Sequence, residues 1–284
     1  MINAMEIIQK RTSVRTYSLR PLNDRLKAEL EKICGENQSG PFQNSPRFQL
    51  LDLGEIGREE LRKLGTYGVI KGAQLYILGA VREGKYCLED LGYSMENVIL
   101  EATRLGLGTC WLAGTFKRGS FARQMHLSKD ELLPAITPVG YPAEHNTTVN
   151  GLIRLSVGAN RRKPWEELFF NADGKTPLDK EQAGSYRDAL EAVRLGPSAT
   201  NRQPWRLVKD QKDQYHLYLK ENRLYNKLLG KIRIQNIDMG IAMCHFELVA
   251  RQRGNKGCWQ QADPNLHLHG LKYIASWLHN GYIK

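Results

Sequence analysis

Apolar residues recur with helical spacing in two segments of the chain. The first segment comprises Met95, Val98, Ile99, Ala102 and Leu105, and the second comprises Ile237, Ile241, Cys244 and Leu248. Residues three, four or seven positions apart share one face of an α-helix, so each segment predicts a helix packed on a core. A glycine follows each segment, at the position where a left-handed residue commonly ends a helix.

Shorter elements are predicted around each long helix. Two further helices are expected at 24–34 and 180–195, with Asn23 and Asp179 as N-caps. Runs rich in β-branched and aromatic residues predict strands at 47–53, 74–81, 134–140, 205–209, 215–220 and 272–278. This order of elements predicts a mixed α+β fold with helices packed on sheets that are mainly antiparallel.

Several short motifs occur twice in the same order. Pro-Leu and Gly-Pro at 21–22 and 40–41 recur at 177–178 and 196–197, with unchanged spacing. An Ala-x₃-Gly-x₃-Cys-Trp pattern at 102–111 recurs at 250–259. Two matches in the same order favour an internal duplication. We therefore expect two degenerate tandem copies, residues 1–160 and 161–284, that pack tightly on each other as a pseudo-dimer.

Composition and charge narrow the range of partners. The 284 residues are 41% hydrophobic and 25% charged, which is typical of a globular protein. The formal net charge is +11, but the basic residues are scattered and do not alternate with aromatic ones. This pattern favours a phosphorylated small molecule over a nucleic acid, although solvated surface charge is an alternative. No apolar run is long enough to span a membrane, so we expect no membrane partner. The five scattered cysteines and the absence of an apolar leader lead us to expect a cytoplasmic protein.

The segment Arg11-Thr12-Ser13-Val14-Arg15 is the first candidate binding motif. Alternate residues of an extended segment point the same way, so Arg11, Ser13 and Arg15 would share one face. Two guanidinium groups with a hydroxyl between them suit a phosphate ester. The alternative is a pair of surface arginines.

Three later segments are further candidates. Residues 196–205, Gly-Pro-Ser-Ala-Thr-Asn-Arg-Gln-Pro-Trp, combine small residues that allow close backbone approach with amide and hydroxyl groups that suit a polar planar ligand. Residues 105–116 predict a helix end, a short strand and a turn at Ala113-Gly114, whose N–H groups could face a ligand. The basic run 161–163 could close a phosphate site. The alternatives are a proline-rich turn, a structural connection and a solvated basic patch, respectively.

Together these segments resemble the motif set of the FMN-dependent nitroreductase superfamily. The segments that carry the resemblance are RTSVR, GLGTCWLAGTF, ITPVGYP (136–142), RRKPWEEL and PSATNRQPW. Ordinary members carry each motif once per chain and form dimers with two FMN sites at the interface. Here the motifs are divided between two halves, which resembles the single-chain, duplicated branch of the superfamily. The resemblance implies a nitroreductase-like fold.

The resemblance also implies a set of cofactor-binding residues. These are Arg11, Thr12, Ser13, Arg15 and Arg162 around the FMN phosphate and the nearby ribityl chain or ring edge, Leu112, Ala113 and Gly114 against the isoalloxazine, and Pro197, Ser198, Ala199, Asn201 and Gln203 from the opposite half. The family often has an acidic residue where Ala113 stands, so that contact could come only from the backbone here. No catalytic side chain and no metal ligand is implied.

RTSVR has no counterpart in the second half, and the first half has only a degraded counterpart of PSATNRQPW, at 40–46. One intact pairing predicts one FMN per chain, in a cleft between the halves. The implied activity is ping-pong transfer of hydride from NAD(P)H through FMN to a nitroaromatic, quinone or similar acceptor, by a monomeric chain that acts on small molecules. The alternative is a flavin-binding protein with little or no turnover.

Overall fold

A computed structural model describes residues 3–36, 39–143, 161–222, 232–266 and 268–279. The chain divides into two compact units. One unit is Gln9–Val157, and the other combines Met1–Ile8 with Gly158–Lys284. The sequence boundary at residue 160 differs from this division mainly at the N-terminus, because residues 1–8 group with the later part of the chain. Helix α1 (Ala4–Lys10) connects the two groups.

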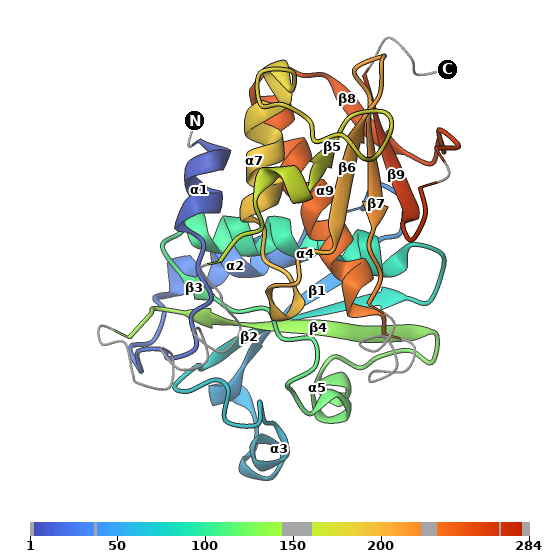
Figure 1. Ribbon diagram of the computed structural model, residues 1–284. Helices are drawn as coiled ribbons and strands as arrows, with labels where there is room; N and C mark the ends of the chain where they lie inside the picture. The colour runs from blue at the N-terminus through green and yellow to red at the C-terminus, as the bar shows by residue number, and fades with distance from the viewer. Residues whose placement is uncertain (1–2, 37–38, 144–160, 223–231, 267, 280–284) are drawn as a thin grey trace. The chain divides into compact units, whose positions relative to one another are not determined.

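The unit Gln9–Val157 contains a four-stranded antiparallel sheet (Figure 1). Its strand order is β1-β2-β4-β3. Its elements in chain order are α2 (Asp24–Gly35), β1 (Arg47–Asp52), the 3₁₀ helix η1 (Leu53–Glu55), α3 (Arg58–Lys63), β2 (Leu75–Arg82), α4 (Cys87–Arg104), β3 (Gly108–Thr109), α5 (Arg118–Gln124) and β4 (Glu131–Gly140).

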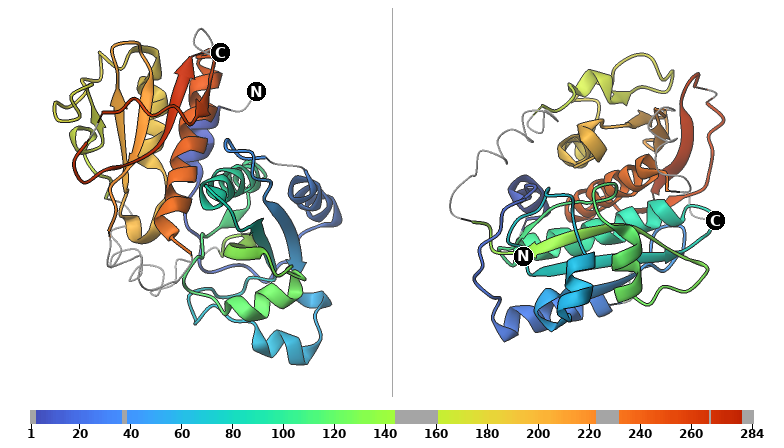
Figure 2. Two further views of the ribbon diagram at one scale, coloured as in Figure 1. Left: turned by 90° about the vertical axis from the view of Figure 1, so that its right-hand side faces the viewer. Right: turned by 90° about the horizontal axis from the view of Figure 1, so that it is seen from below.

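Strand β2 shows how this sheet is covered on both faces. Alternate residues of a strand point to opposite faces. Tyr76 and Leu78 belong to a core that also contains Phe121 of α5. Gly79 faces the other way, where a Cβ would meet Leu91 and Met95 of α4. Figure 2 shows α2 and α4 on one side of the sheet and α5 on the other. Because both faces are covered, all of β2 except its last residue is buried.

The second unit contains a five-stranded sheet of order β5-β6-β7-β9-β8. All its pairs are antiparallel except β5 with β6. Helices α7 and α9 pack together on this sheet (Figure 1). Its elements are the 3₁₀ helix η2 (Trp165–Glu167), β5 (Phe169–Phe170), the 3₁₀ helix η3 (Gly184–Tyr186), α7 (Arg187–Leu195), the 3₁₀ helix η4 (Ala199–Asn201), β6 (Trp205–Lys209), β7 (Tyr215–Leu219), α9 (Ile234–Gln252), β8 (Gly257–Gln260) and β9 (Lys272–His279).

Most predicted elements are confirmed, and one helix start is wrong. Asn23 caps α2 by accepting a hydrogen bond from the Leu26 N–H at 2.9 Å. The helix expected from residue 180 begins instead at Arg187. Asp179 does accept a hydrogen bond from the Glu181 N–H, but only within a turn. Gly184 follows with φ of 56°, a left-handed conformation that an α-helix cannot include.

The two units repeat one order of elements. Apart from the short helices η1, α3, α5 and η4, the order helix, strand, strand, helix, strand, strand describes α2-β1-β2-α4-β3-β4 and also α7-β6-β7-α9-β8-β9. The sheet orders correspond as well, since β1-β2-β4-β3 matches β6-β7-β9-β8. Gly106 and Gly254 follow the two long helices with φ of 79° and 84°, as the repeat predicts. The mixed α+β fold is therefore confirmed, while the packing of two copies as a pseudo-dimer stays a prediction.

Candidate functional site

The segment 11–15 is extended and lies beside strand β3. Ser13 forms a parallel bridge with Thr109, and the Val14 N–H donates to the Thr109 carbonyl at 2.8 Å. Arg11 is buried, whereas Thr12 is exposed, as alternation along an extended segment requires. Burial raises the pKa of the Cys110 thiol. The charges of Arg15 and Arg11 and a hydrogen bond with Ser13 lower it, so all three residues lie close to this thiol. The three predicted residues Arg11, Ser13 and Arg15 are therefore gathered around one point.

This arginine cluster carries positive charge that the described residues do not fully compensate. Nε and Nη1 of Arg11 and Nη1 of Arg15 are buried without a hydrogen-bond partner. Glu96 is the nearby carboxylate, with 3.9 Å between its Oε1 and Arg11 Nε. Buried donors without acceptors cost free energy, and a phosphate oxygen would remove that cost. The donor set therefore fits an anionic group.

The turn after β3 follows Thr109, the residue with which the segment 11–15 pairs, and its three predicted residues differ in exposure. Leu112 is buried in the core of the unit, and its N–H and carbonyl both pair with Ile136. The Ala113 carbonyl accepts a hydrogen bond from Arg118. Gly114 is exposed. The backbone of Ala113 and Gly114 is thus the part of this turn that a ligand can approach.

In the second unit, the loop 196–204 has an unusual backbone. Thr200, Asn201 and Gln203 have φ of 48°, 54° and 49°. Such left-handed conformations are uncommon outside glycine and are least favourable for a β-branched residue such as Thr200. Ser198 Oγ closes the loop by accepting a hydrogen bond from the Gln203 N–H at 2.8 Å. The surrounding contacts therefore hold three residues of this loop in conformations that are intrinsically costly.

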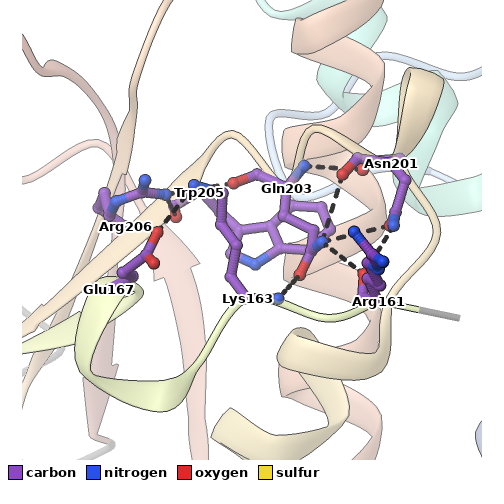
Figure 3. Close-up of polar contacts among 8 residues, drawn as sticks. Arg161, Lys163, Glu167, Asn201, Gln203, Trp205 and Arg206 are labelled. Atoms are coloured by element: carbon purple, nitrogen blue, oxygen red, sulfur yellow. Dashed lines mark hydrogen bonds and ion pairs between the residues drawn. The ribbon is translucent and has the colours of Figure 1, made fainter. Parts of the chain in front are cut away.

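The basic run 161–163 supplies many of those contacts. Arg162 Nη1 donates to Asn201 Oδ1 at 2.7 Å, and Asn201 Nδ2 donates to the Arg161 carbonyl at 2.7 Å. The buried side chain of Gln203 accepts a hydrogen bond from the Lys163 N–H at 2.8 Å (Figure 3). Arg162, Asn201 and Gln203, which the sequence placed in one site, are therefore brought together.

A buried carboxylate of α9 supports the same loop. Asp238 Oδ1 accepts a hydrogen bond from the Ala199 N–H at 3.0 Å, while its Oδ2 is buried without a partner. Burial raises the pKa of Asp238 to about 7, and the hydrogen bond from Ala199 opposes that rise. Sequence reasoning missed Asp238. The repeat contained the signal, because Asp90 and Asp238 both lie 20 residues before the Cys of a Cys-Trp pair.

A second polar cluster lies within the sheet of this unit. His216 Nδ1 lies 2.7 Å from Ser276 Oγ, and His216 Nε2 lies 3.3 Å from Asp210 Oδ2. The residue types resemble a hydrolase triad, but Ser276 Oγ is buried and donates to the Ala262 carbonyl at 2.7 Å. A hydroxyl that is engaged and shielded from solvent cannot attack a substrate. We interpret this cluster as structural.

The predicted site residues thus form two clusters, one in each unit, and their meeting in a single cleft stays a prediction. Among the residues that the structure describes, no group of His, Cys, Asp and Glu side chains is arranged to hold a metal ion. None of the described helices has the length and apolar character that crossing a membrane requires.

Comparisons with known proteins agree on one family. The family model described as "Putative TM nitroreductase" matches residues 3–250. A structure of a putative nitroreductase from Thermotoga maritima is 20% identical, covers 98% of this chain and 94% of its own, and superposes with a TM-score of 0.62. A "Putative NADH dehydrogenase/NAD(P)H nitroreductase" from Methanothermobacter thermautotrophicus is 24% identical over 52% of this chain and 81% of its own length.

Proposed function

Because the chain belongs to the family described as "Putative TM nitroreductase", we propose that it is an FMN-dependent NAD(P)H oxidoreductase that reduces a nitroaromatic, a quinone or a similar acceptor. The relative from Methanothermobacter thermautotrophicus carries a name of the same class. When bound, FMN supplies the two-electron chemistry that links NAD(P)H to the acceptor. The remaining roles belong to side chains and backbone groups of this chain.

The observation that carries the proposal is the arginine cluster of the first unit. Arg11 and Arg15 present buried N–H groups that have no acceptor within the described residues. A phosphate dianion supplies several acceptor oxygens at once and compensates both guanidinium charges. We assign Arg11, Thr12, Ser13 and Arg15 to the FMN phosphate and its ester, with Ala113 and Gly114 at the isoalloxazine through their backbone. Leu112 would support that turn from the core.

The loop 196–204 would orient the rest of the cofactor. Pro197, Ser198 and Ala199 present a small surface that a planar ring system can approach closely. Asn201 and Arg162 carry polar groups at one end of the loop. Gln203 already uses its amide to bind the Lys163 N–H, so we assign it to positioning of the loop. The proposal includes one FMN per chain, a monomer and small-molecule substrates.

Flavin binding and reduction test the proposed function. Protein reconstituted with FMN should retain one flavin per chain after desalting, and NADH or NADPH should bleach the flavin absorbance without oxygen. Addition of menadione or a nitroaromatic should restore that absorbance. Two flavins per chain would refute the single site, and a retained flavin that neither nicotinamide reduces would refute the enzymatic activity.

The double variant Arg11→Ala/Arg15→Ala tests the assigned phosphate site. A hydrogen bond to a charged group contributes about 1.5–3 kcal/mol, so loss of both arginines should weaken FMN binding by at least about a hundredfold. Arg11→Ala also removes the cation nearest to the buried Glu96 carboxylate, so some stability should be lost, and thermal denaturation checks that the variant is still folded at the temperature of the titration. Arg25→Ala, which removes an exposed arginine of the same unit, is the matched control. Unchanged flavin affinity in the double variant would contradict the assignment.

A further inference from the structure

A cavity of about 390 Å³ lies at one end of the sheet in the second unit. Cavities of about 300–1,000 Å³ are the usual size of small-molecule sites. Strand β6 begins and strand β7 ends at this point, because the two strands are antiparallel. The Lys220 N–H donates to the Pro204 carbonyl at 2.8 Å and fixes this end. Arg206 and Lys220 thereby line the same cavity, although they are 14 positions apart.

The wall of the cavity is strongly cationic. Its charged lining residues are Lys163, Arg202, Arg206, Lys220 and Glu221, so four cations face one carboxylate. Lys163 is partly neutralised, because its Nζ lies 3.0 Å from Glu167 Oε2. Within the part of the chain that the structure describes, Arg202 and Lys220 have no ion-pair partner. Positive charge therefore exceeds negative charge at the wall.

Arg206 is the cation of this wall whose burial costs the most free energy, because its charge is shielded from water. The residue is only 5% exposed, and desolvation lowers the pKa of its guanidinium. Its Nη1 donates to the Gln203 carbonyl at 3.1 Å and to the Trp205 carbonyl at 2.6 Å. Both of these hydrogen bonds use one nitrogen and hold the guanidinium in place (Figure 3). The fork of Nε and Nη2 donates to no described residue and stays available for a planar pair of acceptor oxygens.

The neighbouring Glu167 indicates how close the cations are to one another. Its pKa is lowered mainly by the hydrogen bond with Lys163, and the charges of Arg206 and Lys220 contribute to the same shift. One exposed carboxylate thus responds to three cations from three separate segments of the chain. Cations held this close together repel one another, and an anion with two negative charges is the ligand that best relieves this repulsion.

We propose that this cavity is a binding site for a phosphorylated small molecule, whose phosphate group lies between Arg206 and Lys220. The cavity wall does not include Arg11, Arg15 or any other residue of the first unit, and Gln203 is the one lining residue that the proposed cofactor site also uses. Gln203 and Lys163 line the cavity and also stabilise the loop 196–204. A ligand in the cavity would therefore contact the residues that position this loop.

Calorimetric titration with pyrophosphate tests the proposal on the full chain. The wild-type protein should bind pyrophosphate saturably with one site. The double variant Arg202→Gln/Lys220→Gln should raise the Kd by about tenfold or more, since charge-assisted contacts are lost. Both side chains are exposed, so the substitutions should leave the fold intact. Lys256→Gln removes an exposed lysine of the same unit outside the cavity, and its Kd should stay within about twofold.

Three outcomes overturn the proposal. They are no saturable binding of pyrophosphate by the wild-type protein, an unchanged Kd in the double variant, and an equal loss of affinity in Lys256→Gln. Competition titrations with NADP⁺, NAD⁺ and a sugar phosphate then identify the source of the phosphate group. Flavin absorbance is recorded for every variant, so failure of FMN binding is seen separately from failure of the cavity to bind pyrophosphate.

Discussion

The two units hold equivalent loops in different ways. Each loop follows the first helix of its repeat, and each receives support from an aspartate on the long helix, Asp90 on α4 or Asp238 on α9. Asp90 accepts hydrogen bonds from the Phe42 N–H, the Asn44 N–H and the Asn44 side chain, at 2.9, 2.9 and 2.8 Å. Asp238 accepts one hydrogen bond from backbone, that of Ala199, and its Oδ2 has no partner.

The difference indicates what each loop is built for. The first loop satisfies its carboxylate with its own backbone and with Asn44, so its polar groups are used internally. The second loop leaves half of its carboxylate unsatisfied and maintains three left-handed residues. Natural sequences accept such costs mainly where function requires them. This asymmetry supports the proposal that one loop, and not both, serves a cofactor.

The largest expected effect is an opposite response to the same substitution. Asp90→Asn keeps one acceptor oxygen and turns the other into an NH2 group that faces at least one of the three donors, which should destabilise the protein by about 3 kcal/mol. Asp238→Asn keeps an acceptor for the Ala199 N–H and removes a buried charge. Since burial raises the pKa of Asp238 to about 7, this variant should stabilise the protein at pH 8 by up to about 4 kcal/mol. Urea denaturation at pH 8 compares the two.

The pH dependence sharpens this prediction. Between about pH 4 and pH 7 the folded state keeps the proton on Asp238 that the unfolded state has lost, so wild-type stability should fall as pH rises through this range. The advantage of Asp238→Asn should therefore be small near pH 4 and complete above pH 7. A loss of stability at pH 8 in both variants would show that the two aspartates are equivalent.

A second expected difference concerns the glycines that begin the loops. A Cβ on Gly40 would lie 2.2 Å from Cγ of Asp90, whereas a Cβ on Gly196 would lie 3.0 Å from the Val193 carbonyl oxygen and 3.4 Å from Trp205. Gly40→Ala should therefore destabilise the protein by about 3 kcal/mol, and Gly196→Ala by about 1 kcal/mol. Thermal denaturation measures both. Equal losses would mean that the first loop can shift away from α4.

The repeat and the helices could be predicted from the sequence because both depend on the spacing of residues along the chain. Strand β6 at Trp205–Lys209 was predicted with its observed bounds, and the cap at Asn23 was predicted from residue type alone. The late start of α7 was not predicted, because the left-handed conformation of Gly184 depends on contacts that local propensity does not include. Single-sequence patterns identify elements better than they place the ends of those elements.

The supporting residues of the site were harder to find. Gln235 and Asp238 lie near the start of α9 and look like its solvent-facing positions, yet both are buried. Helix α9 is covered almost all round, so its polar residues satisfy loops and not water. Arg206 likewise follows a strand pattern in which a basic residue normally faces solvent. Only the tertiary structure shows that its guanidinium is shielded and held by two carbonyls.

The smallest expected effects come from the two loop asparagines, and they separate cofactor binding from stability. Asn44→Ala removes a hydrogen bond to Asp90, which should lower the free energy of unfolding by about 1 kcal/mol and leave FMN affinity unchanged. Asn201→Gly keeps the left-handed backbone but releases Arg162, which should weaken FMN binding by about tenfold. Fluorescence titration with FMN, paired with urea denaturation, measures both quantities for each variant. If Asn44→Ala also weakened FMN binding, the first loop would contribute to a cofactor site, and the proposal that only the second loop serves the cofactor would be wrong.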